Sequence, residues 1–262
     1  MTVLFDLLQQ WKGVYMKGKF LLPLVILVVM LVGCSPNGTN LLKEELVTPT
    51  AIPTNTPVPE EDTESSLYDD FSAVDPAWLD TYVVTTSAGY DSMISKVELK
   101  GGNLVFDIQE AETYLYKFYK NPARPDVVIE ASVEGNGAQV NGMALVCRAK
   151  NDYSGWYEFR VSDEARYFVY RYDQALKTDE KNPYIELASG KFSKDDFTPF
   201  DANTLRMTCE GNTISVEVNG NLITELEDYA LPESGMVGLG GMSHNMLPVI
   251  VNFDYLSYGS RK

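Results

Sequence analysis

The stretch from Asn203 to Gly259 constrains the fold most, because its apolar residues recur at the two-residue period of half-buried strands. The alternating apolar positions are Leu205, Met207 and Cys209, then Ile214, Val216 and Val218, then Leu222 and Leu226. Gly211-Asn212 and Asn219-Gly220-Asn221 separate these runs and are typical hairpin turns. The stretch therefore predicts consecutive antiparallel strands joined by tight turns.

The same pattern begins near residue 67 and continues through the chain. Further strand candidates are residues 82–84, 93–99, 103–108, 113–119, 127–133, 143–149, 156–161 and 166–172. No run of ten or more residues here holds a helical period, and 173–200 is the longest irregular insertion, expected to form a lid or a rim. About 195 residues exceed a ~100-residue immunoglobulin sandwich. We therefore expect an all-β, two-sheet antiparallel jelly-roll sandwich over 67–262.

The first 33 residues predict an export signal. Lys17 and Lys19 follow Met16, the predicted start, and precede an apolar run at 20–32. Leu31-Val32-Gly33-Cys34 resembles the lipobox of bacterial lipoproteins, which implies a signal helix over 1–33 and lipidation of Cys34. A transmembrane helix is the alternative, but about 13 apolar residues fall short of the ~20 that a span needs.

Residues 34–66 predict a disordered linker, because they are rich in Pro, Thr and acidic residues and poor in large apolar ones. The run Glu60-Glu61-Asp62 could serve as a cation site, but we interpret it as a solvated stretch. The net charge of −16 argues against nucleic acid as a partner. Together these features predict an anchored protein of the cell membrane or outer envelope that faces the extracytoplasmic side.

Several short motifs of the folded part resemble one known family. They are D-D-F at Asp70, G-N-L at Gly102, C-R-x-x-N-D-Y-S-G-W-Y-E-F at 147–159, N-x-L-R-M-x-C at 203–209, V-x-V-N-G at 216–220, G-x-V-G-L at 235–239 and V-x-F-D-Y at 251–255. The pattern is similar to concanavalin A-like lectin/glucanase jelly rolls, within them to the laminin-G-like and keto-disaccharide-hydrolase-like domains of bacterial surface lipoproteins. The resemblance implies fold more strongly than activity.

The resemblance also implies two structural features. Related domains tend to carry the Cys147 and Cys209 pair together, which favours a disulfide in an oxidising compartment. Two buried free thiols are the alternative. Relatives often hold structural Ca²⁺, for which Asp70 and Asp254 on the first and last strands are the candidate ligands. The alternative for these two residues is a place at a strand edge or turn.

The sequence offers no convincing catalytic group. Family-16 glycosidases of this fold carry E-x-D-x-x-E, which is absent from 67–262, and Glu158 has no acid at position 156 or 160. Glu225 and Glu227 share a strand face but sit at a hairpin end, and His244 has no G-x-S-x-G partner motif. With one His and three Cys, a zinc site is hard to assemble. The sequence thus predicts that the protein is not an enzyme.

A binding face is predicted instead on the strands at 156–161 and 166–172. With a turn at 162–165, one outer face would gather Arg148, Trp156, Glu158, Arg160, Tyr167 and Arg171. Aromatic planes can stack on sugar rings, and Arg and Glu can bond hydroxyls or carboxylates. A solvated face with surface ion pairs is the alternative.

From these features we expect a lipid-anchored module that recognises a glycan or another cell-surface polymer. A hydrolase of the keto-disaccharide-hydrolase-like group and a structural envelope protein without a small ligand remain the alternatives.

Overall fold

The computed structural model describes residues 66–85, 91–124, 126–137, 142–177, 182–231 and 234–260. The predicted signal helix at 1–33, the lipidated Cys34 and the linker up to residue 65 lie outside the described residues. Within the described ranges, no helix is long and apolar enough to cross a membrane. The helix that they contain is a single 3₁₀ turn, η1 (Gln174–Leu176).

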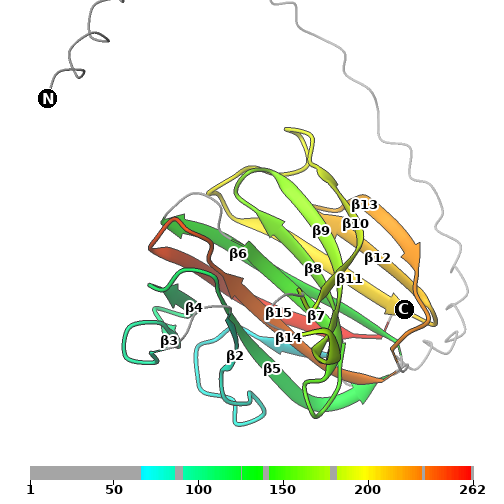
Figure 1. Cartoon of the computed structure of the whole chain (residues 1–262), viewed down its shortest axis with the longest axis horizontal. Coiled ribbons are helices and arrows are strands. Elements are labelled where there is room, and N and C mark those ends of the chain that lie inside the picture. Colours follow the sequence, from blue (N-terminus) through cyan, green and yellow to red (C-terminus); the bar gives the residue numbers. More distant parts are fainter. Residues whose placement is uncertain are drawn as a thin grey trace, which may run out of the picture. The chain divides into compact units, whose positions relative to one another are not determined.

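The strands form two antiparallel sheets (Figure 1). Sheet A has the order β13-β12-β11-β6-β15-β4-β3, with β1 added beside β15. Its strands are β1 (Leu67–Asp69), β3 (Lys96–Lys100), β4 (Asn103–Ile108), β6 (Val127–Gly137), β11 (Asn203–Glu210), β12 (Thr213–Val218), β13 (Asn221–Glu227) and β15 (Val249–Gly259). The predicted all-β, two-sheet jelly-roll sandwich is therefore confirmed.

Sheet B has the order β10-β9-β8-β7-β14-β5-β2. Its strands are β2 (Tyr82–Thr85), β5 (Thr113–Arg124), β7 (Gly142–Ala149), β8 (Gly155–Ser162), β9 (Arg166–Asp173), β10 (Tyr184–Lys191) and β14 (Gly235–Met242). The segment at 173–200, expected to be irregular, thus contributes the edge strand β10 to this sheet.

The core between the sheets follows the predicted alternation. In β12, Ile214, Val216 and Val218 are buried while the residues between them are partly exposed. Asn219 and Gly220 carry positive φ angles of 51° and 82°, as a tight hairpin turn requires. The hairpin β12–β13 is therefore built by its turn residues as well as by burial of its apolar face.

A disulfide joins Cys147 of β7 to Cys209 of β11 across the two sheets. Both cysteines are fully buried in the core. The predicted disulfide is confirmed, and the alternative of two free thiols is not adopted by the structure.

A second buried layer covers the outer face of sheet B, the side turned away from sheet A. It consists of Val84, Tyr116, Phe118, Ala144, Val146, Ala149, Trp156, Tyr172, Tyr184, Met236 and Met242. Gly240 of β14 makes room for this layer, because a Cβ atom at that position would lie 2.9 Å from the ring of Tyr116. Aromatic rings from β5 can therefore lie across β14 toward the centre of the sheet.

Candidate functional site

The register of β8 with β9 decides which predicted residues share a face. Trp156 pairs with Tyr172, Glu158 with Tyr170 and Arg160 with Phe168. Because directly paired residues point to the same side of a sheet, these six side chains line the outer face of sheet B. The three residues predicted on β8 are therefore brought together as expected.

The predicted placement of Tyr167 and Arg171 beside them is wrong. Ser162 pairs with Arg166, so the connecting loop has three residues and not the four that were assumed. Ala165 closes this loop with a φ of 56°. A register error of one residue moves every side chain of a strand to the opposite face. Tyr167 and Arg171 accordingly lie on the inner side of β9.

On that inner side, Arg171 forms an ion pair with Asp228, whose carboxylate also accepts a hydrogen bond from the Tyr157 hydroxyl at 2.6 Å. Burial acts to raise the pKa of Asp228. Hydrogen bonds from Tyr157, the Ala230 N–H and Arg171 outweigh burial, so this pKa lies below its ordinary value. Burial and the contact with Asp228 raise the pKa of Tyr157 to about 12. Arg171 is thus part of a structural cluster.

Arg148 is also misplaced by the alternation argument. It has a φ of 53° and lies where the pairing of β7 with β14 shifts register. Its side chain is buried, with Nη2 4.0 Å from the carboxylate of Asp126, the residue before β6 of sheet A. The bulge therefore turns Arg148 away from the outer face of sheet B.

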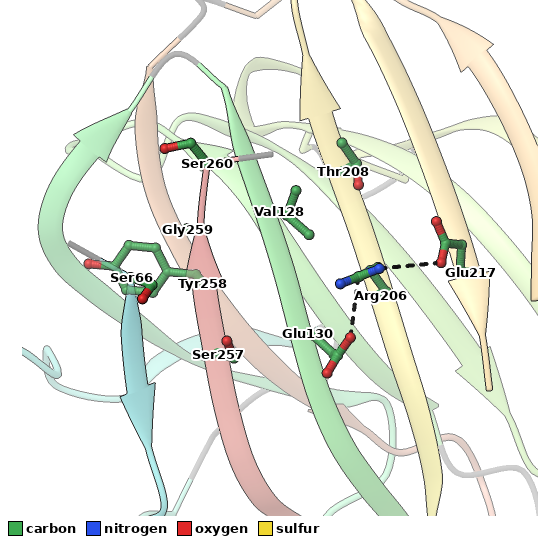
Figure 2. Close-up of a pocket in the computed structure, with 10 residues that line it drawn as sticks. All are labelled: Ser66, Val128, Glu130, Arg206, Thr208, Glu217, Ser257, Tyr258, Gly259 and Ser260. Atoms are coloured by element: carbon green, nitrogen blue, oxygen red, sulfur yellow. Dashed lines mark ion pairs between the residues drawn. The ribbon is translucent and has the colours of Figure 1, made fainter. Parts of the chain in front are cut away.

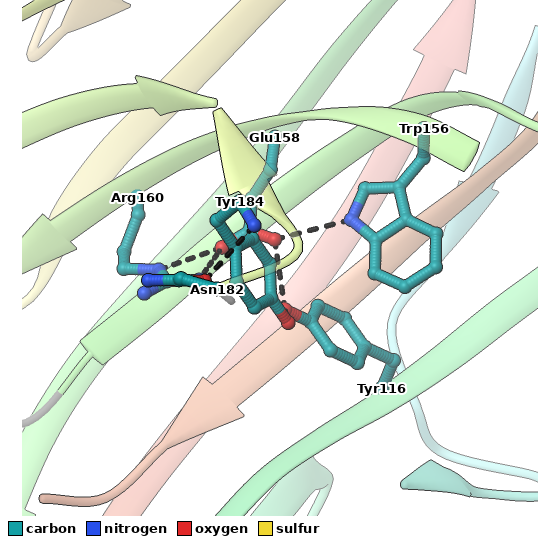
Figure 3. A network of polar contacts seen from close by, with 6 residues as sticks. All are labelled: Tyr116, Trp156, Glu158, Arg160, Asn182 and Tyr184. Atoms are coloured by element: carbon teal, nitrogen blue, oxygen red, sulfur yellow. Dashed lines mark hydrogen bonds and ion pairs between the residues drawn. The ribbon is translucent and has the colours of Figure 1, made fainter. Parts of the chain in front are cut away.

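Glu158 is the centre of the polar network on the outer face of sheet B (Figure 3). Its Oε1 lies 2.6 Å from both Nε and Nη2 of Arg160. Its Oε2 accepts hydrogen bonds from the Tyr116 hydroxyl at 2.8 Å and from Trp156 Nε1 at 3.1 Å. The hydroxyl oxygens of Tyr116 and Tyr184 are 2.7 Å apart. Strands β5, β8 and β10 are thereby tied together.

This network is covered, contrary to the expectation of an open Trp156. Trp156 and Glu158 are fully buried, and Arg160 is 7% exposed. The indole of Trp156 stacks on Tyr172 with ring centroids 3.6 Å apart and an interplanar angle of 10°. Sequence alternation indicated the face but not the aromatic layer above it. A role of Trp156 in ligand binding stays a prediction.

The charged pair lies inside a box of tyrosines. The Arg160 guanidinium lies 4.7 Å from the ring centre of Tyr170, 4.8 Å from that of Tyr184 and 5.2 Å from that of Tyr114. Burial disfavours the charged guanidinium, but the Glu158 carboxylate and the surrounding tyrosines together outweigh burial and raise the Arg160 pKa above its ordinary value. Burial and the same carboxylate raise the pKa of Tyr116 and Tyr184. The network therefore holds an ion pair and neutral phenols.

A more accessible aromatic surface adjoins this box. Tyr114, Phe168 and Tyr170 are only partly buried. The rings of Phe168 and Tyr170 are nearly parallel, 8° apart in orientation and 5.5 Å between centroids. The predicted binding face does not include Phe168 and Tyr170, because the turn assumed at 162–165 puts them on the opposite side of β9. Tyr114, Tyr116 and Phe118 alternate along β5, and the approach of Tyr116 to β8 depends on non-local strand pairing.

His244 lies at the same end of the face as Tyr114, with ring centroids 6.1 Å apart. Its Nδ1 is 3.7 Å from the Glu112 carboxylate. Glu225 and Glu227, the other acids considered, are exposed on β13 at the far edge of sheet A. The structure therefore brings one histidine–carboxylate pair to the rim of the aromatic surface.

The candidate calcium ligands lie on the strands that were expected to be neighbours. β1, which ends just before Asp70, pairs with β15, which contains Asp254. Both carboxylates are exposed, and that of Asp70 accepts the N–H of Ser72 at 3.0 Å. No group of three His, Cys, Asp or Glu side chains among the described residues could hold a metal ion. Calcium at these residues stays a prediction.

A cavity of ≈410 Å³ lies on the opposite side of the sandwich, on the outer face of sheet A (Figure 2). Arg206 on its floor is paired with Glu130 at 3.2 Å and with Glu217 at 3.7 Å. These two carboxylates neutralise the one arginine of the cavity. The residues predicted for ligand contact are all on sheet B, so this cavity is a separate surface.

No family model matches the sequence, and no curated protein matches it. Solved structures do match the fold. One from a study of endo-acting O-glycanases of human gut bacteria has a TM-score of 0.55 at 12% identity, and the alignment covers 75% of this chain and 99% of that one. The Bacillus licheniformis β-glucanase has a TM-score of 0.53 at 10% identity, and the alignment covers 76% of this chain and 100% of that one.

The catalytic domain of an endo-1,3-β-glucanase (laminarinase) from Thermotoga petrophila gives a TM-score of 0.54 at 12% identity, covering 75% of this chain and 97% of that one. These neighbours are glycoside hydrolases, which contradicts the prediction that the protein is not an enzyme; the missing E-x-D-x-x-E motif was not a sufficient reason to exclude activity. The described sandwich is a concanavalin A-like jelly roll.

Proposed function

We propose that this protein acts on a glycan that lies across the outer face of sheet B, over Tyr114, Phe168 and Tyr170. The observation that supports this most is the pairing of accessible aromatic planes with the Arg160–Glu158 network on one sheet face. Aromatic planes stack on the apolar faces of sugar rings, and fixed N–H and O–H groups select hydroxyls. The glycanases with the same fold are consistent with this substrate class.

Hydrolysis is the reaction to test on this face. Glycoside hydrolysis uses two carboxyl groups, about 5–5.5 Å apart for retention and 6.5–9.5 Å for inversion. Glu158 is fully buried and contacts three side chains, which indicates a positioning role. Glu112, beside Tyr114, and Glu186, paired with Tyr170, are the carboxylates nearer the accessible rings.

The full-length protein should be titrated with a panel of oligosaccharides and assayed for release of new reducing ends. Tyr170→Ala and Phe168→Ala should weaken binding about tenfold or more, since stacking on a ring is lost. Tyr229→Ala is the matched control, because Tyr229 is 69% exposed and lies outside sheet B. If no oligosaccharide binds and no reducing ends appear, the proposed function fails. Release that disappears in Glu112→Gln or Glu186→Gln would identify the reacting carboxylate.

Anchorage is the second part of the proposal. We propose that lipid on Cys34 holds the glycan-acting sandwich at the outer side of a membrane. The support is the match of Leu31-Val32-Gly33-Cys34 to a lipobox directly after a basic and apolar leader. In this arrangement the enzyme or binder stays at the surface where polymeric glycans are met.

A further inference from the structure

One end of the outer face of sheet B gathers basic and hydroxyl groups. β8 ends at Ser162 and β9 begins at Arg166, and these two residues pair directly. Lys191 of β10 pairs with Arg166 on its other side, and Arg160 lies two residues before Ser162 on β8. All four side chains therefore belong to the same face. We call Arg160, Ser162, Arg166 and Lys191 the basic end.

The basic end contains donors that no acceptor in the described part of the chain uses. Ser162 is 8% exposed, and its hydroxyl has no hydrogen-bond partner there. Nε of Arg166 is likewise buried without a hydrogen-bond partner. A buried polar group without a partner destabilises the fold relative to one that is satisfied. Such groups at one place indicate a site that is completed by an acceptor from outside.

Each of the two arginines lies against an aromatic ring of β9. The Arg166 guanidinium lies 5.3 Å from the ring centre of Phe168, and that of Arg160 lies 4.7 Å from the ring centre of Tyr170. These two rings are adjacent and nearly parallel. Glu158 occupies only the Nε–Nη2 edge of Arg160. Arg160 is thus committed to Glu158 and enclosed by tyrosine rings, whereas Arg166 is only partly buried and is the guanidinium of this end that is left for a ligand.

The charge balance of this end also favours an anion. Neither Arg166 nor Lys191 forms an ion pair within the described residues, whereas Arg206 on sheet A is held by two carboxylates. Glu186, on the same face of β10, accepts a hydrogen bond from Ser189 at 2.7 Å. Glu164 is exposed in the β8–β9 turn. Asp163, in the same turn, is buried with its carboxylate against Gly135 of β6, which places it on the inner side of sheet B. On the outer face of this end, Arg166 and Lys191 therefore have no carboxylate of the described residues as an ion-pair partner.

We infer that the basic end binds an anionic substituent of the glycan, either a uronic acid carboxylate or a sulfate ester. The inference rests on the proposed function and names the class of glycan. Guanidinium groups bind carboxylate and sulfate oxygens through paired N–H bonds, and the Ser162 hydroxyl adds a third donor. The sugar ring that carries the anion would stack on Phe168, between the two arginines.

The test compares three kinds of oligosaccharide on the full-length protein: neutral β-1,3-glucan, oligogalacturonate and sulfated carrageenan oligosaccharides. Affinity is measured by calorimetry at low and at physiological salt. A charged oligosaccharide should bind at least about tenfold more tightly than the neutral one, and this advantage should shrink as salt rises. Preference for galacturonate or for carrageenan distinguishes the carboxylate from the sulfate.

Arg166→Gln, Ser162→Ala and Lys191→Gln should each reduce the advantage of the charged oligosaccharide, with Arg166→Gln lowering that affinity about tenfold. Their affinity for a neutral oligosaccharide should stay within about twofold. Arg206→Gln is the matched control, because it removes an arginine from the outer face of sheet A. Urea unfolding of each variant verifies that it is folded. Should Arg166→Gln be unstable, Lys191→Gln serves as the second variant, because Lys191 is exposed.

Equal affinity for neutral and charged oligosaccharides, unaffected by Arg166→Gln and Lys191→Gln, would overturn the anionic inference and leave the glycan function standing. Binding to none of the three, and to no other glycan, would overturn both. Loss of affinity for charged and neutral oligosaccharides alike in Arg166→Gln would also contradict the inference, since it would assign Arg166 to general glycan contact.

Discussion

At the scale of single residues, Glu158 is the group on which the outer face of sheet B depends. Its carboxylate is fully buried and contacts Arg160, Tyr116 and Trp156 from three directions. A buried ion pair stabilises a fold weakly relative to apolar residues of the same volume, but removing one partner leaves an uncompensated charge. The main contribution of Glu158 to stability is therefore that it compensates the buried charge of Arg160.

Glu158→Gln should lower the free energy of unfolding by about 3–5 kcal/mol, because Arg160 stays charged without its carboxylate. The urea midpoint would fall by about 1–2 M. Glu98→Gln is the control: Glu98 pairs with Lys96 at 2.8 Å on the exposed β3, where a pair contributes about 0–1 kcal/mol. Adding Arg160→Met to Glu158→Gln should recover part of the loss. A midpoint equal to that of the unmodified protein would contradict this account of the pair.

Asp228 makes the stability of the fold depend on pH in the acid range. Its pKa is below the ordinary value in the folded state, so the folded protein favours the ionised carboxylate. The stability from this group is present above its unfolded pKa near 4 and is lost as pH falls through the lower folded pKa.

Asp228→Asn should therefore flatten the fall of stability with acid pH below about 4 and lower stability at pH 7 by about 1–3 kcal/mol. Urea unfolding at a series of pH values measures both effects. Asp195→Asn, at an exposed site, should leave the curve unchanged. An Asp228→Asn curve parallel to that of the unmodified protein at every pH would show that Asp228 is not the responsible group.

At the scale of elements, sequence pattern predicted those strands whose partners are their neighbours in the chain. The two hairpins of β11, β12 and β13 combine apolar alternation with the turns Gly211-Asn212 and Asn219-Gly220, and both are found as predicted. The prediction of which β9 residues face outward was wrong, because the sequence from Ser162 to Arg166 does not show whether the connecting loop has three or four residues. The approach of Tyr116 to Glu158 joins strands 42 residues apart, which no local pattern contains. The loop length removed Tyr167 and Arg171 from the predicted site, and the bulge at Arg148 removed a third residue.

The disulfide between β7 and β11 is the covalent link between the sheets, and its residues are separated by 62 positions. Replacing Cys147 and Cys209 together by Ala should lower the free energy of unfolding by about 2–5 kcal/mol, since the unfolded chain gains conformational freedom. Urea unfolding with and without a reductant measures it. The reductant should destabilise the unmodified protein and leave the double variant unchanged; an effect on both would assign the loss to something other than this bond.

At the scale of the whole molecule, the two outer faces differ in chemistry. The outer face of sheet B carries aromatic rings and arginines, whereas the cavity on sheet A pairs its arginine with Glu130 and Glu217. A glycan polymer that lies along one face can be engaged by a protein held at a surface, provided that the tether leaves this face free. The linker predicted at 34–66, rich in Pro and Thr, would be suited to such spacing.

The tether itself is tested by Cys34→Ser in a bacterial host that processes lipoproteins. The unmodified protein should sediment with membranes and incorporate labelled fatty acid, because two or three acyl chains give stable anchoring where one does not. Cys34→Ser should lose the label and the cleavage before residue 34. Cys147→Ala with Cys209→Ala is the matched control, since it removes two cysteines and should keep the lipid.

Label retained in Cys34→Ser would place the anchor elsewhere. Sedimentation without label in the unmodified protein would indicate that the apolar run at 20–32 stays in the membrane uncleaved.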